Sequence, residues 1–107
     1  MAVREFNLPL VGASFRVKRL TRRMISDSLE EEAIGCSLEL EPDNEWDDKA
    51  VKVILTDYLP DLHIGYIGRP ANKALFDLIV ESDLRMNCLI TSFDYENGTG
   101  NVRITTD

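Results

Sequence analysis

Short stretches in which apolar and polar residues alternate recur along the chain, and each ends within a few residues at glycine, proline or asparagine. This pattern predicts short β-strands. We expect them over residues 8–15, 36–42, 50–55, 62–68, 86–93 and 101–106. A turn is expected at DYLPD (57–61), and the Asn-Gly pair in YENGTG (95–100) predicts a hairpin between the last two strands. Strands so short and closely spaced favour a small barrel or a strongly curled antiparallel sheet, with helices over an opening.

Helical periodicity is clearest in RPANKALFDLIVES (69–82). Pro70 suits the first helical position, and one face carries the apolar residues Ala71, Ala74, Leu75, Leu78 and Ile79. ISDSLEEEAIG (25–35) resembles a second helical turn, with Ser26 or Asp27 as its N-cap and Gly35 as its stop. Residues 15–24 fit either a continued strand or a basic helix.

The length of 107 residues allows one domain with a single core, which we place over residues 1–107. The chain has neither a signal-peptide segment nor a run of about 18 apolar residues that could span a bilayer. We therefore expect a soluble, cytoplasmic protein without a membrane partner.

Metal and cofactor sites find little support in the sequence. Cys36, Cys88 and His63 offer at most three of the about four ligands that zinc needs, so buried reduced thiols are expected. Asp43, Glu45 and Asp47 have calcium-loop spacing, but the following positions lack the glycine and the glutamate of that loop. Nucleophile-elbow, Walker and HExxH motifs are absent as well. We expect no metal, no cofactor and no enzyme activity.

Charge is distributed unevenly along the chain. The net charge of −7 opposes non-specific binding to nucleic acid. Five of the twelve bases nevertheless fall within eight residues, at Arg16, Lys18, Arg19, Arg22 and Arg23. In LHIGYIGRP (62–70), a strand is followed by glycine, Arg69 and a helix start. This order suits either one phosphate group or a plain tight turn.

The segment EPDNEWDDKAVKV (41–53) holds the only tryptophan of the chain, between Glu45 and Asp47. A tryptophan gains little from a solvated acidic loop. Trp46 therefore either folds back onto the core or is displayed to hold a flat ligand.

Together with LVGASF (10–15) and HIGYIGRPANKAL (63–75), this segment resembles the HIRAN domain family, in its stand-alone bacterial or phage type. The similarity covers V-G-x-x-Y/F, the E/D-P-x-N-x-Y/W-D core motif and the strand-to-helix junction, from Leu10 to Ile79. The resemblance implies a mainly β fold with two helices: a small six-stranded antiparallel barrel of OB or SH3-like kind, flanked by the helices. It also implies non-catalytic binding of single-stranded DNA at a free 3′-hydroxyl end, in DNA repair, replication or remodelling. A helicase or nuclease would be its partner protein.

By position, the resemblance assigns base stacking to Phe15 and Trp46 and hydroxyl recognition to Asn44 and Asp47. Arg69 would meet phosphate, and Tyr66 would make a further contact. Ser14 and Glu45 depart from the arginine and proline common at these positions, so Arg22 and Arg23 are candidates to supply compensating positive charge.

Two further functions stay open: a protein-interaction or regulatory module that keeps the fold without DNA binding, and, more remotely, a metal-dependent nuclease. The location of the strip from Arg16 to Arg23 discriminates between the first of these and DNA binding. A strip near Trp46 and Arg69 favours DNA, and a strip on the far face favours a partner protein.

Overall fold

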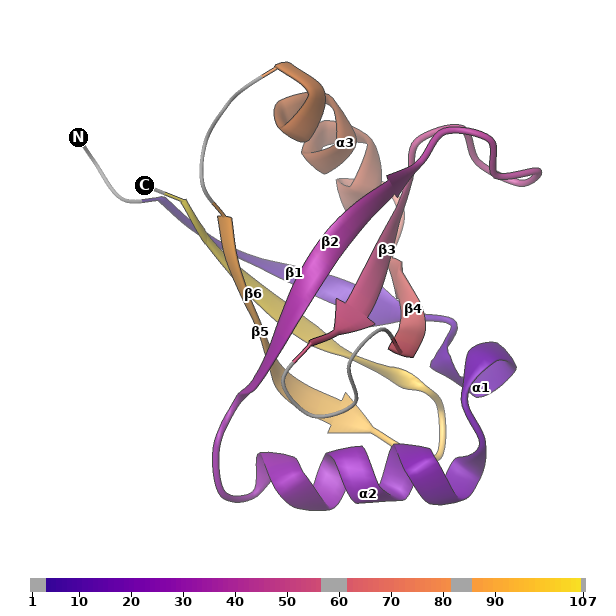
Figure 1. Cartoon of the computed structure of the whole chain (residues 1–107), viewed down its shortest axis with the longest axis vertical. Helices are drawn as coiled ribbons and strands as arrows, with labels where there is room; N and C mark the ends of the chain where they lie inside the picture. The colour runs from indigo at the N-terminus through magenta and orange to yellow at the C-terminus, as the bar shows by residue number, and fades with distance from the viewer. Residues whose placement is uncertain (1–3, 57–61, 82–85, 107) are drawn as a thin grey trace.

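The computed structural model describes residues 4–56, 62–81 and 86–106 and has six strands and three helices in these ranges (Figure 1). Their order is β1 (Arg4–Val11), α1 (Ala13–Arg16), α2 (Arg19–Leu29), β2 (Ile34–Glu41), β3 (Ala50–Leu55), β4 (Leu62–Ile67), α3 (Ala71–Glu81), β5 (Met86–Asp94) and β6 (Thr99–Thr106). The strands form a closed antiparallel barrel in the order β1-β4-β3-β2-β5-β6. The predicted six-stranded antiparallel barrel is confirmed, and three helices accompany it where two were predicted, because α1 forms a separate short turn before α2. The expected turn at 57–61 lies outside the described residues.

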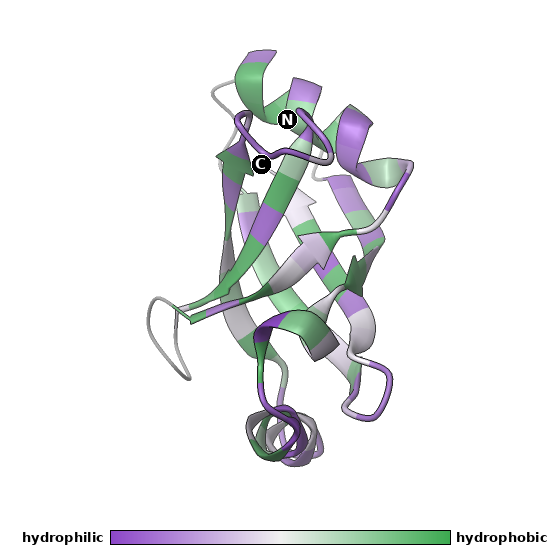
Figure 2. Cartoon of the chain, turned by 90° about the vertical axis from the view of Figure 1, so that its right-hand side faces the viewer, coloured by the Kyte–Doolittle hydropathy of each residue, from purple (hydrophilic) through white to green (hydrophobic). Residues whose placement is uncertain are grey.

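The alternation seen in the sequence becomes an inside and an outside of the barrel. In β3, Val51, Val53 and Leu55 are fully buried, whereas Lys52 and Ile54 between them face outward and are half-buried. The banding of apolar and polar residues along the strands is visible in Figure 2. Because successive side chains of a strand point to opposite faces, this pattern places the core inside the barrel.

The two cysteines lie opposite each other inside this core. Cys36 of β2 pairs with Cys88 of β5 in the antiparallel register, and both side chains are buried. They are not joined by a disulfide bond, so the expectation of buried thiols is confirmed.

The first strand, β1, pairs over very different lengths with its two neighbours in the barrel. β1 pairs with β6 over seven residues, from Arg4 to Leu10. Its pairing with β4 covers only Leu10 opposite Ile67 and Val11 opposite Tyr66. One further hydrogen bond, from the Gly68 N–H to the Pro9 carbonyl at 2.8 Å, extends this short seam.

Residues 12–30 differ most from the sequence-based expectation. The first strand ends at Val11, because Gly12 adopts a left-handed conformation with φ of 83° and is the N-cap of α1. The helical turn predicted over residues 25–35 is wrong: α2 occupies Arg19–Leu29, and Gly35 lies within β2. Burial explains the shift, since Arg22 and Ile25 share the face of α2 that packs on the barrel. The basic-helix alternative for residues 15–24 is the one the structure adopts.

Arg22 fastens this segment to the barrel. Its Nε donates to the Tyr95 carbonyl at 2.7 Å, and one terminal nitrogen donates to the carbonyls of Val17 and Ser14, at 2.8 and 3.4 Å. The guanidinium therefore joins α1, α2 and the β5–β6 hairpin at one point.

The hairpin also touches α1 directly. The Ala13 N–H donates to the Gly98 carbonyl, and Gly98 has a φ of 71°. A Cβ atom at Gly98 would lie 2.3 Å from the Ser14 nitrogen, so only glycine fits both the turn and the contact. The hairpin expected from the Asn-Gly pair is confirmed.

The helix α3 begins at Ala71, one residue later than predicted, after a cis peptide bond between Arg69 and Pro70. Leu75 and Phe76 are its buried apolar residues, while Ala74 of the predicted apolar face is exposed. Among the helices described, none is long and apolar enough to cross a membrane.

Arg22→Met should lower the free energy of unfolding by about 2–4 kcal/mol, because buried carbonyl groups would lose their donor. Arg23→Met, at an exposed position of the same helix, should change it by less than about 0.5 kcal/mol. Urea unfolding followed by circular dichroism measures both values. Equal stability of the two variants would contradict the anchoring role of Arg22.

Candidate nucleic-acid interface

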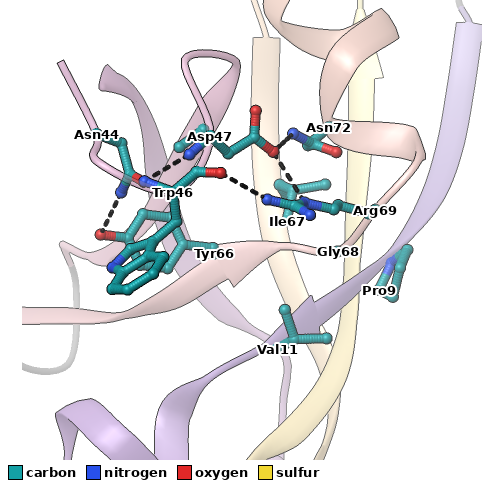
Figure 3. Close-up of a pocket in the computed structure, with 11 residues that line it drawn as sticks. Pro9, Val11, Asn44, Trp46, Asp47, Tyr66, Ile67, Gly68, Arg69 and Asn72 are labelled. Atoms are coloured by element: carbon teal, nitrogen blue, oxygen red, sulfur yellow. Dashed lines mark hydrogen bonds and ion pairs between the residues drawn. The ribbon is translucent and has the colours of Figure 1, made fainter. Parts of the chain in front are cut away.

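A pocket of about 500 Å³ opens where β1, β4, the β2–β3 loop and the start of α3 meet (Figure 3). Its walls include Pro9 and Val11 of β1, Asn44, Trp46 and Asp47 of the loop, Tyr66 of β4, Arg69 just before α3, and Asn72 in the first turn of α3. Five residues singled out in the sequence thus meet in one place: Asn44, Trp46, Asp47, Tyr66 and Arg69.

The side chain of Asn44 shapes the β2–β3 loop. Its Oδ1 accepts hydrogen bonds from the backbone N–H groups of Trp46 and Asp47, at 2.8 and 3.0 Å. Its Nδ2 donates to Glu41 Oε1. An asparagine that binds the backbone two and three residues ahead closes a tight turn. Asn44 therefore sets the direction in which Trp46 and Asp47 leave the loop.

Trp46 is displayed at the mouth of this pocket. Its side chain is 84% exposed, so it does not plug the barrel. Val11, on the β1 side of the pocket, is also exposed, and Tyr66 is half-buried. The pocket thus combines an exposed aromatic ring with a partly apolar floor.

Asp47 is held at the inner side of the loop by three donors. Its Oδ1 accepts from the Lys49 N–H at 2.9 Å, and its Oδ2 accepts from Asn72 Nδ2 at 2.9 Å and Arg69 Nε at 3.1 Å. These donors, the Lys49 N–H first, lower the pKa of Asp47, so it is ionised at neutral pH. A carboxylate has about four acceptor positions. One acceptor position on Oδ1 therefore makes no hydrogen bond to the described residues.

Arg69 joins the loop to the start of α3 and still faces solvent. Besides its bond to Asp47, its terminal nitrogen donates to the Trp46 carbonyl at 2.9 Å. Its side chain is 68% exposed, and three of its five N–H groups make no hydrogen bond to the described residues. These donors can meet an anion at the rim of the pocket.

A hydrogen-bond network that the sequence did not indicate holds the Tyr66 hydroxyl in place. Glu41 accepts from Asn44, from the Tyr66 hydroxyl at 2.9 Å and from Lys52 Nζ at 3.0 Å. The Asn44 bond is the largest cause that lowers the pKa of Glu41 to about 2. Lys52 and Tyr66, at the two ends of this network, lie side by side, because Lys52 of β3 is the register partner of Tyr66 in the neighbouring strand β4.

Arg16 and His63 are also near the site, and neither was assigned a role from the sequence. The His63 and Tyr66 rings meet edge to face with centroids 4.8 Å apart. Burial, and next the positive charge of Arg16, lower the pKa of His63. The same charge opposes the burial that raises the pKa of Tyr66. Arg16 lies on α1, which packs against β4, the strand that carries Tyr66.

The remaining candidates do not line the pocket. Phe15 lies on α1 and is 92% exposed, so its ring is available to a ligand. Arg22 is buried and its donors bind main-chain carbonyls, and Arg23 is exposed on α2. Along the long axis of the molecule, α1 lies between the β2–β3 loop and α2 in both views (Figures 1 and 2). The basic strip thus begins near the pocket and ends at the far end of the barrel.

No group of three or more metal-binding side chains is gathered in the described parts of the chain. The acidic residues of the β2–β3 loop are instead occupied by the loop's own donors or face solvent.

Glu41→Gln should lower the free energy of unfolding by about 2–3 kcal/mol at pH 7. The folded-state pKa of about 2 is below the ordinary value of 4.5. The stabilisation is therefore complete above pH 4.5 and is lost as the pH falls towards 2. Urea unfolding near pH 3 should show less than half of the difference seen at pH 7. A difference independent of pH would contradict the assigned ionisation of Glu41.

Comparison with known proteins gives the fold a reference. No protein-family model matches the sequence, and no curated protein matches it. A crystal structure of the HIRAN domain of human HLTF matches with a TM-score of 0.70 and 16% identity, over 95% of this chain and 74% of that one. A crystal structure of a protein from Lactobacillus plantarum matches with a TM-score of 0.71 and 19% identity, over 98% and 95%. The resemblance found in the sequence is confirmed at the level of architecture: the chain has the fold of a HIRAN domain.

Proposed function

We propose that this chain is a non-catalytic module that binds single-stranded DNA and prefers a free 3′-hydroxyl end. The observation that carries the proposal is that an exposed Trp46 ring and the ionised Asp47 carboxylate line the same pocket. An aromatic platform next to a hydrogen-bond acceptor suits a terminal nucleotide, which has a flat base and a hydroxyl donor.

Base stacking is the first contribution. Trp46 and Phe15 are large aromatic residues with exposures of 84% and 92%, although exposed aromatic surface is unfavourable in water. Stacking of a base on an aromatic ring contributes about 1–3 kcal/mol and accepts any base. Trp46 and Phe15 would hold the terminal bases, with Tyr66 as a further contact.

Hydroxyl recognition is the second contribution. The free acceptor position on Asp47 Oδ1 can take a hydrogen bond from a 3′-hydroxyl, and Asn44 keeps the loop in place for this contact. A 3′-phosphate would bring negative charge against the carboxylate and be repelled. Arg69, with its unused donors, would bind the phosphate that precedes the terminal nucleotide.

The biological setting that we propose is DNA repair, replication or remodelling in the cytoplasm. A small barrel that recognises an end without cutting it needs an enzyme to act on that end. A helicase or a nuclease is the class of partner protein that fits this division of labour.

A protein-interaction module is the second candidate function. The far position of α2 favours it, as do the exposed Leu20 and Met24, one turn apart on that helix. The position of Arg16 on α1, which packs against the strand of Tyr66, favours DNA. We therefore retain DNA binding as the leading proposal.

Titration with a single-stranded oligonucleotide of about four nucleotides tests it, with Trp46 fluorescence as the readout at low salt. A 3′-hydroxyl should give saturable quenching, and a 3′-phosphate or a blunt duplex should give little. Asp47→Asn should reduce affinity for the 3′-hydroxyl and narrow the preference over the 3′-phosphate. Asp43→Asn, an equal charge change at an exposed position of the same loop, is the control.

Absence of quenching with every oligonucleotide, for a folded protein, would refute DNA binding. Equal affinity for oligonucleotides with a 3′-hydroxyl and with a 3′-phosphate would refute recognition of the free end and leave DNA binding itself standing.

Trp46→Ala and Phe15→Ala should each weaken binding by about 5- to 150-fold, as loss of one stacking contact requires. Because both side chains are exposed, neither change should lower the unfolding free energy by more than about 0.5 kcal/mol. Fluorescence anisotropy of labelled DNA measures the affinities, since the first variant lacks tryptophan. An unchanged affinity for Phe15→Ala would remove α1 from the binding site.

A further inference from the structure

We propose that the exposed bases of α1 and α2 form a second DNA contact, which binds the phosphates upstream of the end held in the pocket. This contact, the α1–α2 basic surface, consists of Arg16, Lys18, Arg19 and Arg23. The inference rests on the proposed function and extends it from a terminal nucleotide to the path of the strand.

The first support is the segregation of charge. Residues 6–26 contain five bases and no acid. The other seven bases and all nineteen acids leave the rest of the chain at −12. A protein of this balance repels DNA over most of its surface, and the α1–α2 segment is where attraction can arise.

The second support is that these bases form no salt bridge within the described residues. All four members of the surface are exposed. Within the described ranges, the salt bridges of the chain involve other bases, namely Lys49, Lys52, Arg69 and Arg103. Charges that are neither buried nor paired remain available to phosphate.

The third support is continuity with the pocket. Arg16 follows Phe15 in α1, and α1 packs against β4, whose Tyr66 lines the pocket. From there α1 leads to the N-terminal end of α2 (Figures 1 and 2). Lys18, Arg19 and Arg23 then extend the positive surface away from the pocket.

The fourth support is rigidity. Arg22 binds three carbonyls, and Ser26 Oγ donates to the Phe93 carbonyl at 3.4 Å, so α2 is docked at two points. The Arg19 guanidinium lies over the Tyr95 ring, 5.4 Å from its centroid. Bases held on a docked helix lose less conformational entropy on binding than bases on a free loop.

The test compares oligonucleotides of about four and about twelve nucleotides with the same 3′-hydroxyl end, each titrated at several salt concentrations. Each phosphate contact contributes about −0.7 to the slope of log affinity against log salt for a single strand. We expect Arg19→Gln/Arg23→Gln to reduce the slope by about 1.4 for the long oligonucleotide and to leave the short one unchanged. This corresponds to about a sevenfold smaller loss of affinity between about 50 and 200 mM salt.

Arg4→Gln/Arg103→Gln is the matched control, because it removes the same charge from β1 and β6. If both lengths bind and the two double variants behave alike, the α1–α2 basic surface is refuted while the pocket function stands. If neither length binds the unmodified protein, the proposed function fails and this inference with it. If only the long oligonucleotide binds, through Arg19 and Arg23 and regardless of its 3′ end, the phosphate contact stands and end recognition fails.

Discussion

The carboxylate of Asp47 is the interaction on which the candidate site depends. It receives donors from its own loop, from Arg69 and from α3, so three separate segments are joined at one ionised group. The junction depends on the ionisation of Asp47, because a protonated carboxyl group would accept these hydrogen bonds only weakly. The same group that assembles the pocket also has one acceptor position that no donor of the described residues occupies. Structural support and proposed recognition therefore draw on a single charge.

A second junction, at Arg22, organises the opposite end of the molecule. Here the Arg22 guanidinium donates to main-chain carbonyls of α1 and the β5–β6 hairpin. Asp47, in contrast, accepts hydrogen bonds from two side chains and one backbone N–H group. Between these two junctions lies α1 with the exposed Phe15. The position of this ring therefore follows from contacts distant in the sequence, since Arg22 and Tyr95 are 73 residues apart.

This separation explains what could be predicted from the sequence. The strand over Ala50–Leu55 and the hairpin before Thr99 were predicted well, because period-two alternation and turn chemistry are local properties. The motif around Asn44 predicted a cluster of residues that the structure does bring together. The limits of α2 were predicted wrongly, because they depend on the burial of Arg22 against the β5–β6 hairpin. Tyr95 of this hairpin is 73 residues away along the chain, so the sequence around α2 does not indicate the contact. The Glu41–Tyr66–Lys52 network was missed for the same reason: its members meet only through strand register.

The shortest seam of the barrel has a consequence for ligand binding. β1 meets β4 at only two residue pairs, and one of them, Val11 opposite Tyr66, belongs to the pocket. A ligand in this pocket touches both sides of the place where the barrel closes. Its binding energy must then add to the free energy needed to open the barrel there. Occupancy of the pocket and closure of the barrel are thermodynamically linked, so any ligand bound there would stabilise the closed barrel.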